Sequence, residues 1–178
     1  EQGRLVVFKD AVSRPHNRIP DVAELHAKDE VLIKDFPVFH IQFRHQWKFL
    51  RPGPGNTLYY SVGAPCNSCE PEHETEMAPR PPVDTFGQAA IHRINPDDPR
   101  NSDVIIARGV RNSIGFDLRP GTKDELWFTD NGRDDLGKDL GDDTLNDGIP
   151  NDELNRVSHA GENFGWPYCH TSGRKHFD

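Results

Sequence analysis

Two stretches of the chain, Arg51-Pro-Gly-Pro-Gly-Asn-Thr-Leu-Tyr-Tyr-Ser-Val-Gly63 and Arg119-Pro-Gly-Thr-Lys-Asp-Glu-Leu-Trp-Phe-Thr-Asp-Asn131, align without a gap. The offset between them is 68 residues (119 minus 51). In each, an apolar strand ends in an Arg-Pro-Gly turn, after which a leucine and two aromatic residues begin the next strand. This repeat indicates the architecture, because repeated units that cannot bury their own faces stack on one another.

The sequence before each copy repeats as well. Residues 31–37 correspond to residues 104–110, residues 5–9 correspond to residues 90–95, and a third round begins at residues 153–157. The unit is therefore strand, loop, strand, long loop, strand, tight turn and strand. That order is the four-stranded antiparallel blade of a β-propeller.

The composition supports an all-β domain. The 178 residues include 15 Gly and 15 Pro, and short β-branched and aromatic runs lie between Gly, Pro, Asn and Asp. We predict a partial propeller domain over residues 1–178, with roughly two blades and the start of a third. A few blades cannot close a ring, so we expect a second chain or further residues to complete it. The alternative is a β-sandwich with accidental similarity between strands.

Charge and hydropathy restrict the partners. The net charge is −8, so we expect no nucleic-acid binding, which requires a basic patch. No apolar run approaches 18 residues, so we expect no membrane span. Residues 70–84 are rich in proline and acids and predict a long surface loop. The chain begins at Glu1, and we expect it to start and stop inside a repeat.

Three cysteines, Cys66, Cys69 and Cys169, cannot all pair within one chain. The Cys66-x-x-Cys69 spacing favours a disulfide, local or long-range, in an exported protein. A redox motif is disfavoured because prolines flank the pair. A zinc site that adds His73 or His170 remains an alternative, although the spacing matches no standard knuckle.

Several motifs resemble the glucose and sorbosone dehydrogenase family, and most of all its sorbosone dehydrogenase-like branch. They occur in the family's order between about residues 31 and 170: His45-Gln-Trp-Lys-Phe-Leu, Leu58-Tyr-Tyr-Ser-Val-Gly63, Ala64-Pro-Cys-Asn67, Ala107-Arg-Gly-Val-Arg-Asn112, Leu126-Trp-Phe-Thr-Asp-Asn-Gly-Arg-Asp134, Asp152-Glu-Leu-Asn155 and Gly161-Glu-Asn-Phe-Gly-Trp-Pro167. The resemblance implies a six-bladed propeller, exported from the cytoplasm, that oxidises a sugar with pyrroloquinoline quinone and calcium.

The resemblance also implies roles for individual residues. His45 is the expected base that takes a proton from the sugar, since imidazole titrates near neutral pH. Arg111 and Asn112 are the expected cofactor contacts, because a guanidinium grips a carboxylate with two donors and the cofactor carries three carboxylates. In the glucose enzymes an acid orients the histidine. The matching place here is Gly63-Ala64, so that acid is missing.

Calcium is expected in the acidic segment 130–153. This segment holds nine acids against Arg133 and Lys138 and carries −7 of the total charge of −8. Calcium prefers hard oxygen ligands. The resemblance implies the backbone carbonyls of Gly132 and Arg133 as ligands, and the carboxylates of Asp130 and Asp134 are expected beside them. Many of the remaining acids are expected to be solvated. Trp166, in the last motif, is expected to pack between blades.

Two other functions stay open at this point. The missing acid beside His45 favours a propeller that has kept the scaffold and serves as a binding or structural module, since a fold does not fix function. A hydrolase or lactonase propeller with calcium in its channel is a further possibility.

Overall fold

The computed structural model describes residues 4–8, 30–35, 45, 47–69, 87–145 and 150–171. Within these ranges the strands form sheets of five, three and two strands. The short helices α1 (Pro99–Ser102) and α2 (Leu136–Leu140) and the 3-10 turn Asp143–Leu145 lie between strands. No helix among the described residues is long and apolar enough to cross a membrane. The fold is mostly β, as predicted.

The largest sheet is an antiparallel meander with one added strand. It contains β3 (Leu50–Gly53), β4 (Thr57–Val62), β5 (Ala90–Ile94) and β6 (Val104–Arg108) in chain order. The two-residue strand β10 (Glu162–Asn163) pairs parallel to β6 at the far edge.

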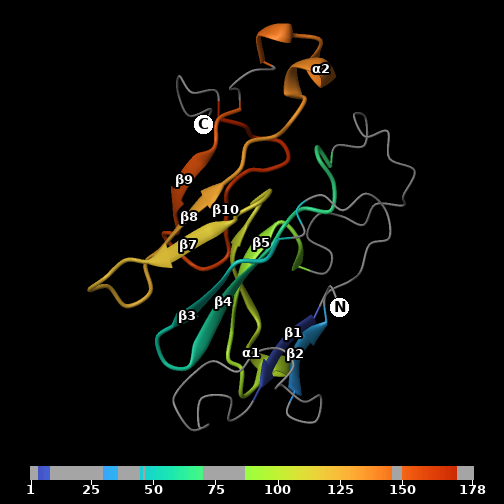
Figure 1. Cartoon of the computed structure of the whole chain (residues 1–178). Helices are drawn as coiled ribbons and strands as arrows, with labels where there is room; N and C mark the ends of the chain where they lie inside the picture. Colours follow the sequence, from blue (N-terminus) through green and yellow to red (C-terminus); the bar gives the residue numbers. More distant parts are fainter. Residues whose placement is uncertain are drawn as a thin grey trace, which may run out of the picture.

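The second sheet is an antiparallel meander of β7 (Gly115–Leu118), β8 (Leu126–Asp130) and β9 (Glu153–Arg156). Figure 1 shows it beside the five-stranded sheet. The strands β1 (Arg4–Phe8) and β2 (Glu30–Asp35) form a separate antiparallel pair.

The two aligned stretches form the hairpins β3–β4 and β7–β8, which lie in different sheets. Tyr60 and Phe128 are 68 residues apart (128 minus 60), whereas their partners Leu50 and Phe116 are 66 apart (116 minus 50), so the offset of 68 holds for the second strand of each hairpin and not for the first. The antiparallel pairs β1–β2 and β5–β6 are also equivalent. One detail differs from the sequence prediction: residues 51–53 belong to β3, and the tight turn follows at residues 54–56.

The predicted boundaries of the blade were wrong. The sequence unit places β5, β6, β7 and β8 in one sheet, whereas β5 and β6 pair with β3 and β4, and β7 and β8 pair with β9. The chain leaves the five-stranded sheet just after β6, at Gly109. This glycine has a positive φ of 65°, and a Cβ there would lie 2.2 Å from Asn163 Oδ1. Glycine suits this conformation and this close approach. The repeat unit is divided between the two sheets at this point.

The main hydrophobic core lies between the two larger sheets. Tyr59, Ile91 and Ile106 from one sheet pack in a cluster with Phe116 and Phe128 from the other. The opposite face of β4 is buried too, because Tyr60 and Val62 join Ile94 in a second cluster. Burial of both faces is expected for a propeller blade, which has a neighbour on each side, and not for a sandwich sheet with one face in water.

Candidate functional site

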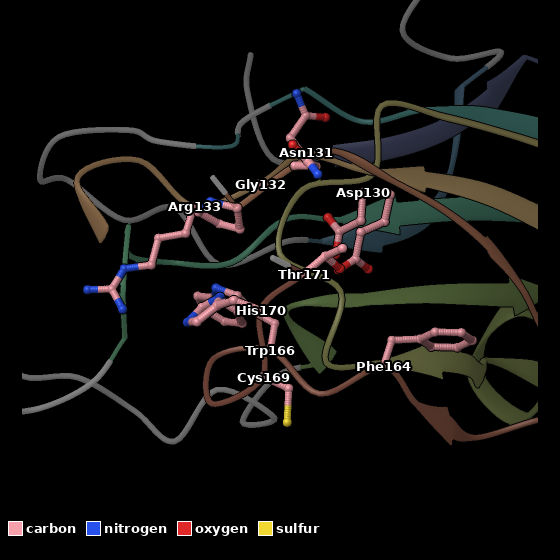
Figure 2. Close-up of a pocket in the computed structure, with 12 residues that line it drawn as sticks. Asp130, Asn131, Gly132, Arg133, Phe164, Trp166, Cys169, His170 and Thr171 are labelled. Atoms are coloured by element: carbon pink, nitrogen blue, oxygen red, sulfur yellow. The ribbon is translucent and has the colours of Figure 1, made fainter. Parts of the chain in front are cut away.

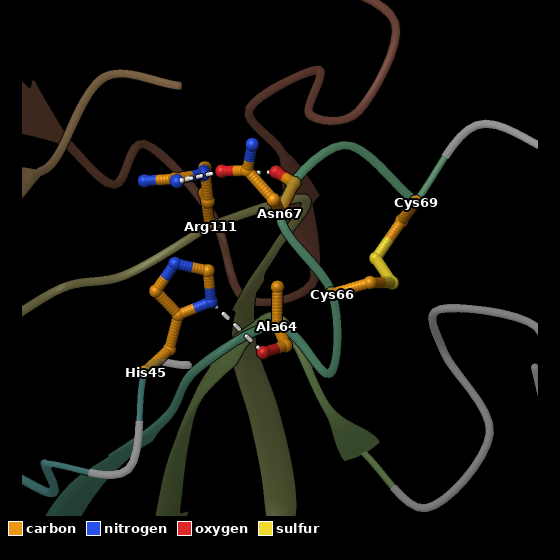
Figure 3. Close-up of a disulfide and its surroundings, with 6 residues drawn as sticks. All are labelled: His45, Ala64, Cys66, Asn67, Cys69 and Arg111. Carbon is orange, nitrogen blue, oxygen red and sulfur yellow. Dashed lines mark hydrogen bonds between the residues drawn. A yellow bond between two sulfur atoms is a disulfide. The ribbon is translucent and has the colours of Figure 1, made fainter. Parts of the chain in front are cut away.

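His45 lies five residues before β3 and is held by the loop that follows β4. Its Nδ1 is 2.9 Å from the carbonyl oxygen of Ala64 (Figure 3). Its backbone has a left-handed φ of 61°, which is uncommon outside glycine and found where the surroundings fix it. A Cβ on Gly63 would lie 2.5 Å from the Cβ of His45, so the neighbouring position must be glycine.

The contact with Ala64 determines the tautomer of His45. A carbonyl oxygen only accepts hydrogen bonds, so Nδ1 carries the hydrogen and Nε2 is the basic nitrogen. The carbonyl thus orients the imidazole, the task that the resemblance assigns to an acid. It is neutral, so it stabilises an imidazolium less than a carboxylate would. The site of the missing acid is filled by Gly63, where a side chain would collide with His45.

Arg111 is the most connected side chain of the site, and it is only 3% exposed. Its Nε donates to Asn67 O (3.1 Å), and its Nη2 donates to Asn67 Oδ1 (2.6 Å) and Asp134 Oδ2 (2.9 Å). Its Nη1 donates to Gly132 O (2.8 Å) and Asn131 O (3.4 Å). A guanidinium has five N–H groups, and these five oxygens of the described residues accept from them. Arg111 therefore ties the loop after β4 to the loop after β8.

Sequence reasoning did not single out Asn67, although it provides two of the five oxygens. Two signals were available: the motif Ala64-Pro-Cys-Asn67, which ends at this residue, and the cysteine spacing that encloses it. These two cysteines form a disulfide, as the local alternative predicted, and Cys169 is an exposed free thiol. The disulfide excludes both sulfurs from a zinc site. His73 and residues 70–84 lie outside the described residues.

Asn112 and Asp130 meet at the backbone next to Arg111. The carboxylate of Asp130 accepts hydrogen bonds from the amides of Arg111 (2.8 Å) and Asn112 (2.7 Å). Burial raises the pKa of Asp130 to about 7, although these two bonds oppose the shift. The charge of Glu153, its partner across β8 and β9, adds to the rise. The side-chain oxygen of Asn112 is buried and has no hydrogen-bond partner among the described residues.

The structure shows three of the four predicted calcium ligands in other contacts. Asp130 binds two backbone amides, and Asp134 and the Gly132 carbonyl bind the Arg111 guanidinium. Arg133 is buried. Among the described residues, no three His, Cys, Asp or Glu side chains are grouped closely enough to hold a metal ion. Calcium binding stays a prediction, and residues 146–149 of the acidic segment lie outside the described residues.

A small cavity of about 20 Å³ lies beside Asp130 and Arg133, which is room for about one water molecule. Figure 2 shows the side chains that line it, from the end of β8 and from the segment 164–171. Trp166, one of them, is buried and packs against the disulfide loop in a cluster with Ala64 and Ala89. These partners flank β4 and β5 of the sheet that also contains β10, so packing of Trp166 between blades stays a prediction.

A larger cavity, of about 590 Å³, lies at the other end of the strands. The turn between β7 and β8 and the residues after β9 line it, together with parts of β4, β5 and β6. No residue predicted for the functional site lines this cavity. It is therefore separate from the site around Arg111.

Comparisons with known proteins give the fold its class. No family model matches the chain. A protein of Borreliella burgdorferi, described only as uncharacterized, is 31% identical over 134 residues, which is 75% of this chain and 29% of that protein. The solved holo form of the pyranose dehydrogenase PQQ domain from Coprinopsis cinerea superposes with a TM-score of 0.57 at 15% identity, over 85% of this chain and 38% of that one.

The chain therefore has a mostly β fold that resembles part of a PQQ-type β-propeller domain, PQQ being pyrroloquinoline quinone. It spans less than half the length of either protein that it matches. The number of blades and the closure of the ring remain predictions.

Proposed function

We propose that the chain is part of a six-bladed quinoprotein sugar dehydrogenase of the sorbosone dehydrogenase-like branch, with pyrroloquinoline quinone as its cofactor. The observation that carries this proposal is the pair Arg111 and Asn112. A buried guanidinium bound to a carboxylate lies next to a buried amide oxygen without a partner among the described residues. A ligand with carboxylates and a hydrogen-bond donor suits that pair.

The residues present fit such a cofactor. Asp134 is the exposed partner of Arg111, with a side chain that is 70% exposed. It binds the guanidinium through its carboxylate, the same group that the cofactor would present. Asp134 lies on the solvent side of this pair, so a cofactor carboxylate could take its place on the buried guanidinium and keep the charge-assisted contact. The other four oxygens around Arg111 belong to backbone or to the buried Asn67 and would remain in place.

His45 is the proposed base. With Nδ1 bound to Ala64, Nε2 is the atom that accepts the proton of the sugar hydroxyl. When bound, pyrroloquinoline quinone would supply the two-electron acceptor for the hydride from the carbon that carries this hydroxyl. The neutral carbonyl orients the imidazole, and the left-handed backbone of His45 with Gly63 packed against it fixes the position of the ring.

Calcium is the second component that the resemblance implies. As placed, the predicted ligands do not fit the ion, because Arg111 already donates to the Gly132 carbonyl and to Asp134. A dication at the same oxygens would be repelled by the guanidinium. No step of the proposal is assigned to calcium.

The disulfide between Cys66 and Cys69 supports export, because such bonds persist in oxidising compartments. The competing function is a propeller that binds a partner without catalysis. The observation in its favour is that the five N–H groups of Arg111 already have five protein oxygens. The two functions differ in whether the full-length protein reduces a dye when sugar is added.

The experiment is a dye-reduction assay on the full-length protein, loaded with pyrroloquinoline quinone and calcium and supplied with a panel of aldoses and sorbosone. The proposal predicts sugar-dependent dye reduction. His45→Ala lowers the turnover number by about 10²- to 10⁴-fold, the usual contribution of a positioned base. His159→Ala, at an exposed histidine, is the matched control. Binding of quinone without any sugar oxidation would favour the binding module.

A further inference from the structure

The loop from Ala64 to Cys69 lies between the proposed base and the proposed cofactor contact. It follows β4 and runs through bends from Pro65 to Ser68. The disulfide closes it, with Cα atoms 5.2 Å apart. Figure 3 shows the His45 ring and the Arg111 side chain on the same side of this loop. A short irregular segment thus contacts both residues.

The loop is fixed by packing and by one main-chain bond. Both cysteines are buried, in a cluster with Ala64, Ala89 and Trp166. The amide of Ala64 donates to the carbonyl of Arg111 at 2.8 Å. A disulfide removes conformational freedom from the residues that it encloses, here Asn67 and Ser68.

Asn67 uses this fixed position to hold Arg111. Its carbonyl and its side-chain oxygen accept from two different nitrogens, Nε and Nη2, on one edge of the guanidinium. Two bonds to a planar group set its orientation as well as its place. The side-chain amide of Asn67 donates in turn to the carbonyl of Asp134 at 3.1 Å. Asn67 therefore fixes Arg111 and the loop that carries its exposed partner.

We propose that Asn67, held by the Cys66–Cys69 disulfide, is a positioning residue that keeps the Arg111 guanidinium oriented for a carboxylate ligand. This inference rests on the proposed function for the identity of the ligand. The contacts by which Asn67 holds Arg111, here called the Asn67 clamp, involve only residues of this chain and do not depend on the proposed function.

The first test needs no cofactor. Phenylglyoxal reacts with accessible arginines, and mass spectrometry of peptides from the full-length protein reports the extent at each one. In the wild type Arg111 is expected to be protected and Arg119, which is exposed, to react. Asn67→Ala should expose Arg111 to the reagent, and so should the double variant Cys66→Ala/Cys69→Ala. Asn67→Asp should restore protection, because it keeps an oxygen toward Nη2.

Arg119 should react equally in every variant, and Asn101→Ala, the same substitution at an exposed asparagine, should leave Arg111 protected. In the variant Cys66→Ala/Cys69→Ala, the further change Asn67→Ala should add little to the reactivity of Arg111. Both changes act on the same contact, between Asn67 and Arg111. Arg111 that stays protected in Asn67→Ala and in the cysteine variant, while thermal unfolding shows both to be folded, would overturn the proposal.

The second test measures quinone affinity by quenching of tryptophan fluorescence. Asn67→Ala should raise the Kd by about three- to tenfold, because a loosened guanidinium must be ordered on binding, while kcat at saturating quinone stays close to the wild-type value. An unchanged or lower Kd contradicts the positioning role. If the wild type binds no quinone while the phenylglyoxal pattern follows expectation, the clamp stands and the proposed function fails.

Discussion

The loops after β4 and after β8 occupy equivalent places in the repeat. They share one hydrogen-bond arrangement, but the basic side chain that they hold differs. In each, the carbonyl of the second residue after the strand accepts a hydrogen bond from a basic side chain that precedes the first strand of the same hairpin. Ala64 accepts from His45, and Gly132 accepts from Arg111. The repeat thus sets where a basic group is held, and the local sequence sets which group it is.

The difference between the two loops lies in charge and closure. The first loop is uncharged from Gly63 to Cys69, buried over most of its length and closed by a disulfide. The second carries Asp134 and Asp135, both exposed, and leads into α2. Arg111 binds both loops. Its contacts with Asn67 of the neutral loop are buried, whereas its contact with Asp134 of the acidic loop is the one that a ligand carboxylate could replace.

The largest expected effect comes from removal of the shared residue. Arg111→Ala leaves the buried oxygens of Asn67 and the part-buried carbonyl of Gly132 without their donor, and each buried acceptor costs about 1–3 kcal/mol. The free energy of unfolding of the full-length protein, from urea titration, should fall by more than for any other change in these loops. Arg119→Ala, at an exposed arginine, should change it by less than about 0.5 kcal/mol. Equal effects would mean that the two loops are not joined through Arg111.

A smaller effect separates the two carbonyl contacts. An added Cβ would lie 2.5 Å from the His45 Cβ at Gly63, and 2.2 Å from the Pro150 oxygen at Gly132. Gly63→Ala and Gly132→Ala should each cost about 1–3 kcal/mol of stability, as overpacking does. Gly63→Ala should lower kcat, because it displaces His45. Gly132→Ala should chiefly raise the Kd for quinone. If Gly63→Ala chiefly raised the Kd and Gly132→Ala chiefly lowered kcat, the two loops would not have the separate roles assigned to them.

The third effect depends on pH. The pKa of Asp130 is about 7 in the folded chain and close to its ordinary value of 3.8 when unfolded. The unfolded state therefore loses its proton first, and the Asp130 contribution to stability falls as pH rises from about 4 to about 7 and is constant above that. Asp130→Asn should remove this dependence from the free energy of unfolding measured across that range. If the difference in free energy of unfolding between the wild type and Asp130→Asn did not change with pH, the raised pKa of Asp130 would be refuted.

The smallest effect on stability is expected at Asp134. Its ion pair with Arg111 is exposed on one side, so Asp134→Asn should cost at most about 1 kcal/mol. The same change should lower the Kd for quinone, because a competing carboxylate leaves Arg111. Asp135→Asn, at the neighbouring exposed acid, controls for the loss of one charge. A rise in Kd for Asp134→Asn would show that Asp134 assists the ligand rather than competes with it.

Much of the fold could be predicted from the sequence, because the repeat depends on local patterns. The Arg-Pro-Gly stretches predicted both hairpins, although the 68-residue offset holds only for β4 and β8. The cysteine spacing left open the local disulfide that forms. The division into sheets could not be predicted, since it depends on the close approach at Gly109 to residues more than 50 positions later. No local pattern indicates such a contact.

The site was predicted less completely. Sequence motifs indicated His45, Arg111 and Asn112, but not what holds them. The acceptor on His45 is a backbone carbonyl, which any residue at position 64 provides, so the residue type contains no signal. The role of Asn67 depends on the fold bringing two loops of different repeats to one guanidinium.

The most direct test of a quinone site beside Arg111 is a titration of the full-length protein with pyrroloquinoline quinone in the wild type and in Asn112→Ala. The buried oxygen of Asn112 has no partner among the described residues, so its loss should not lower the melting temperature. We predict saturable one-to-one binding to the wild type and a Kd about three- to tenfold higher in Asn112→Ala, with Asn101→Ala unchanged. Absence of saturable binding to the wild type, or equal affinity in Asn112→Ala, would contradict the account.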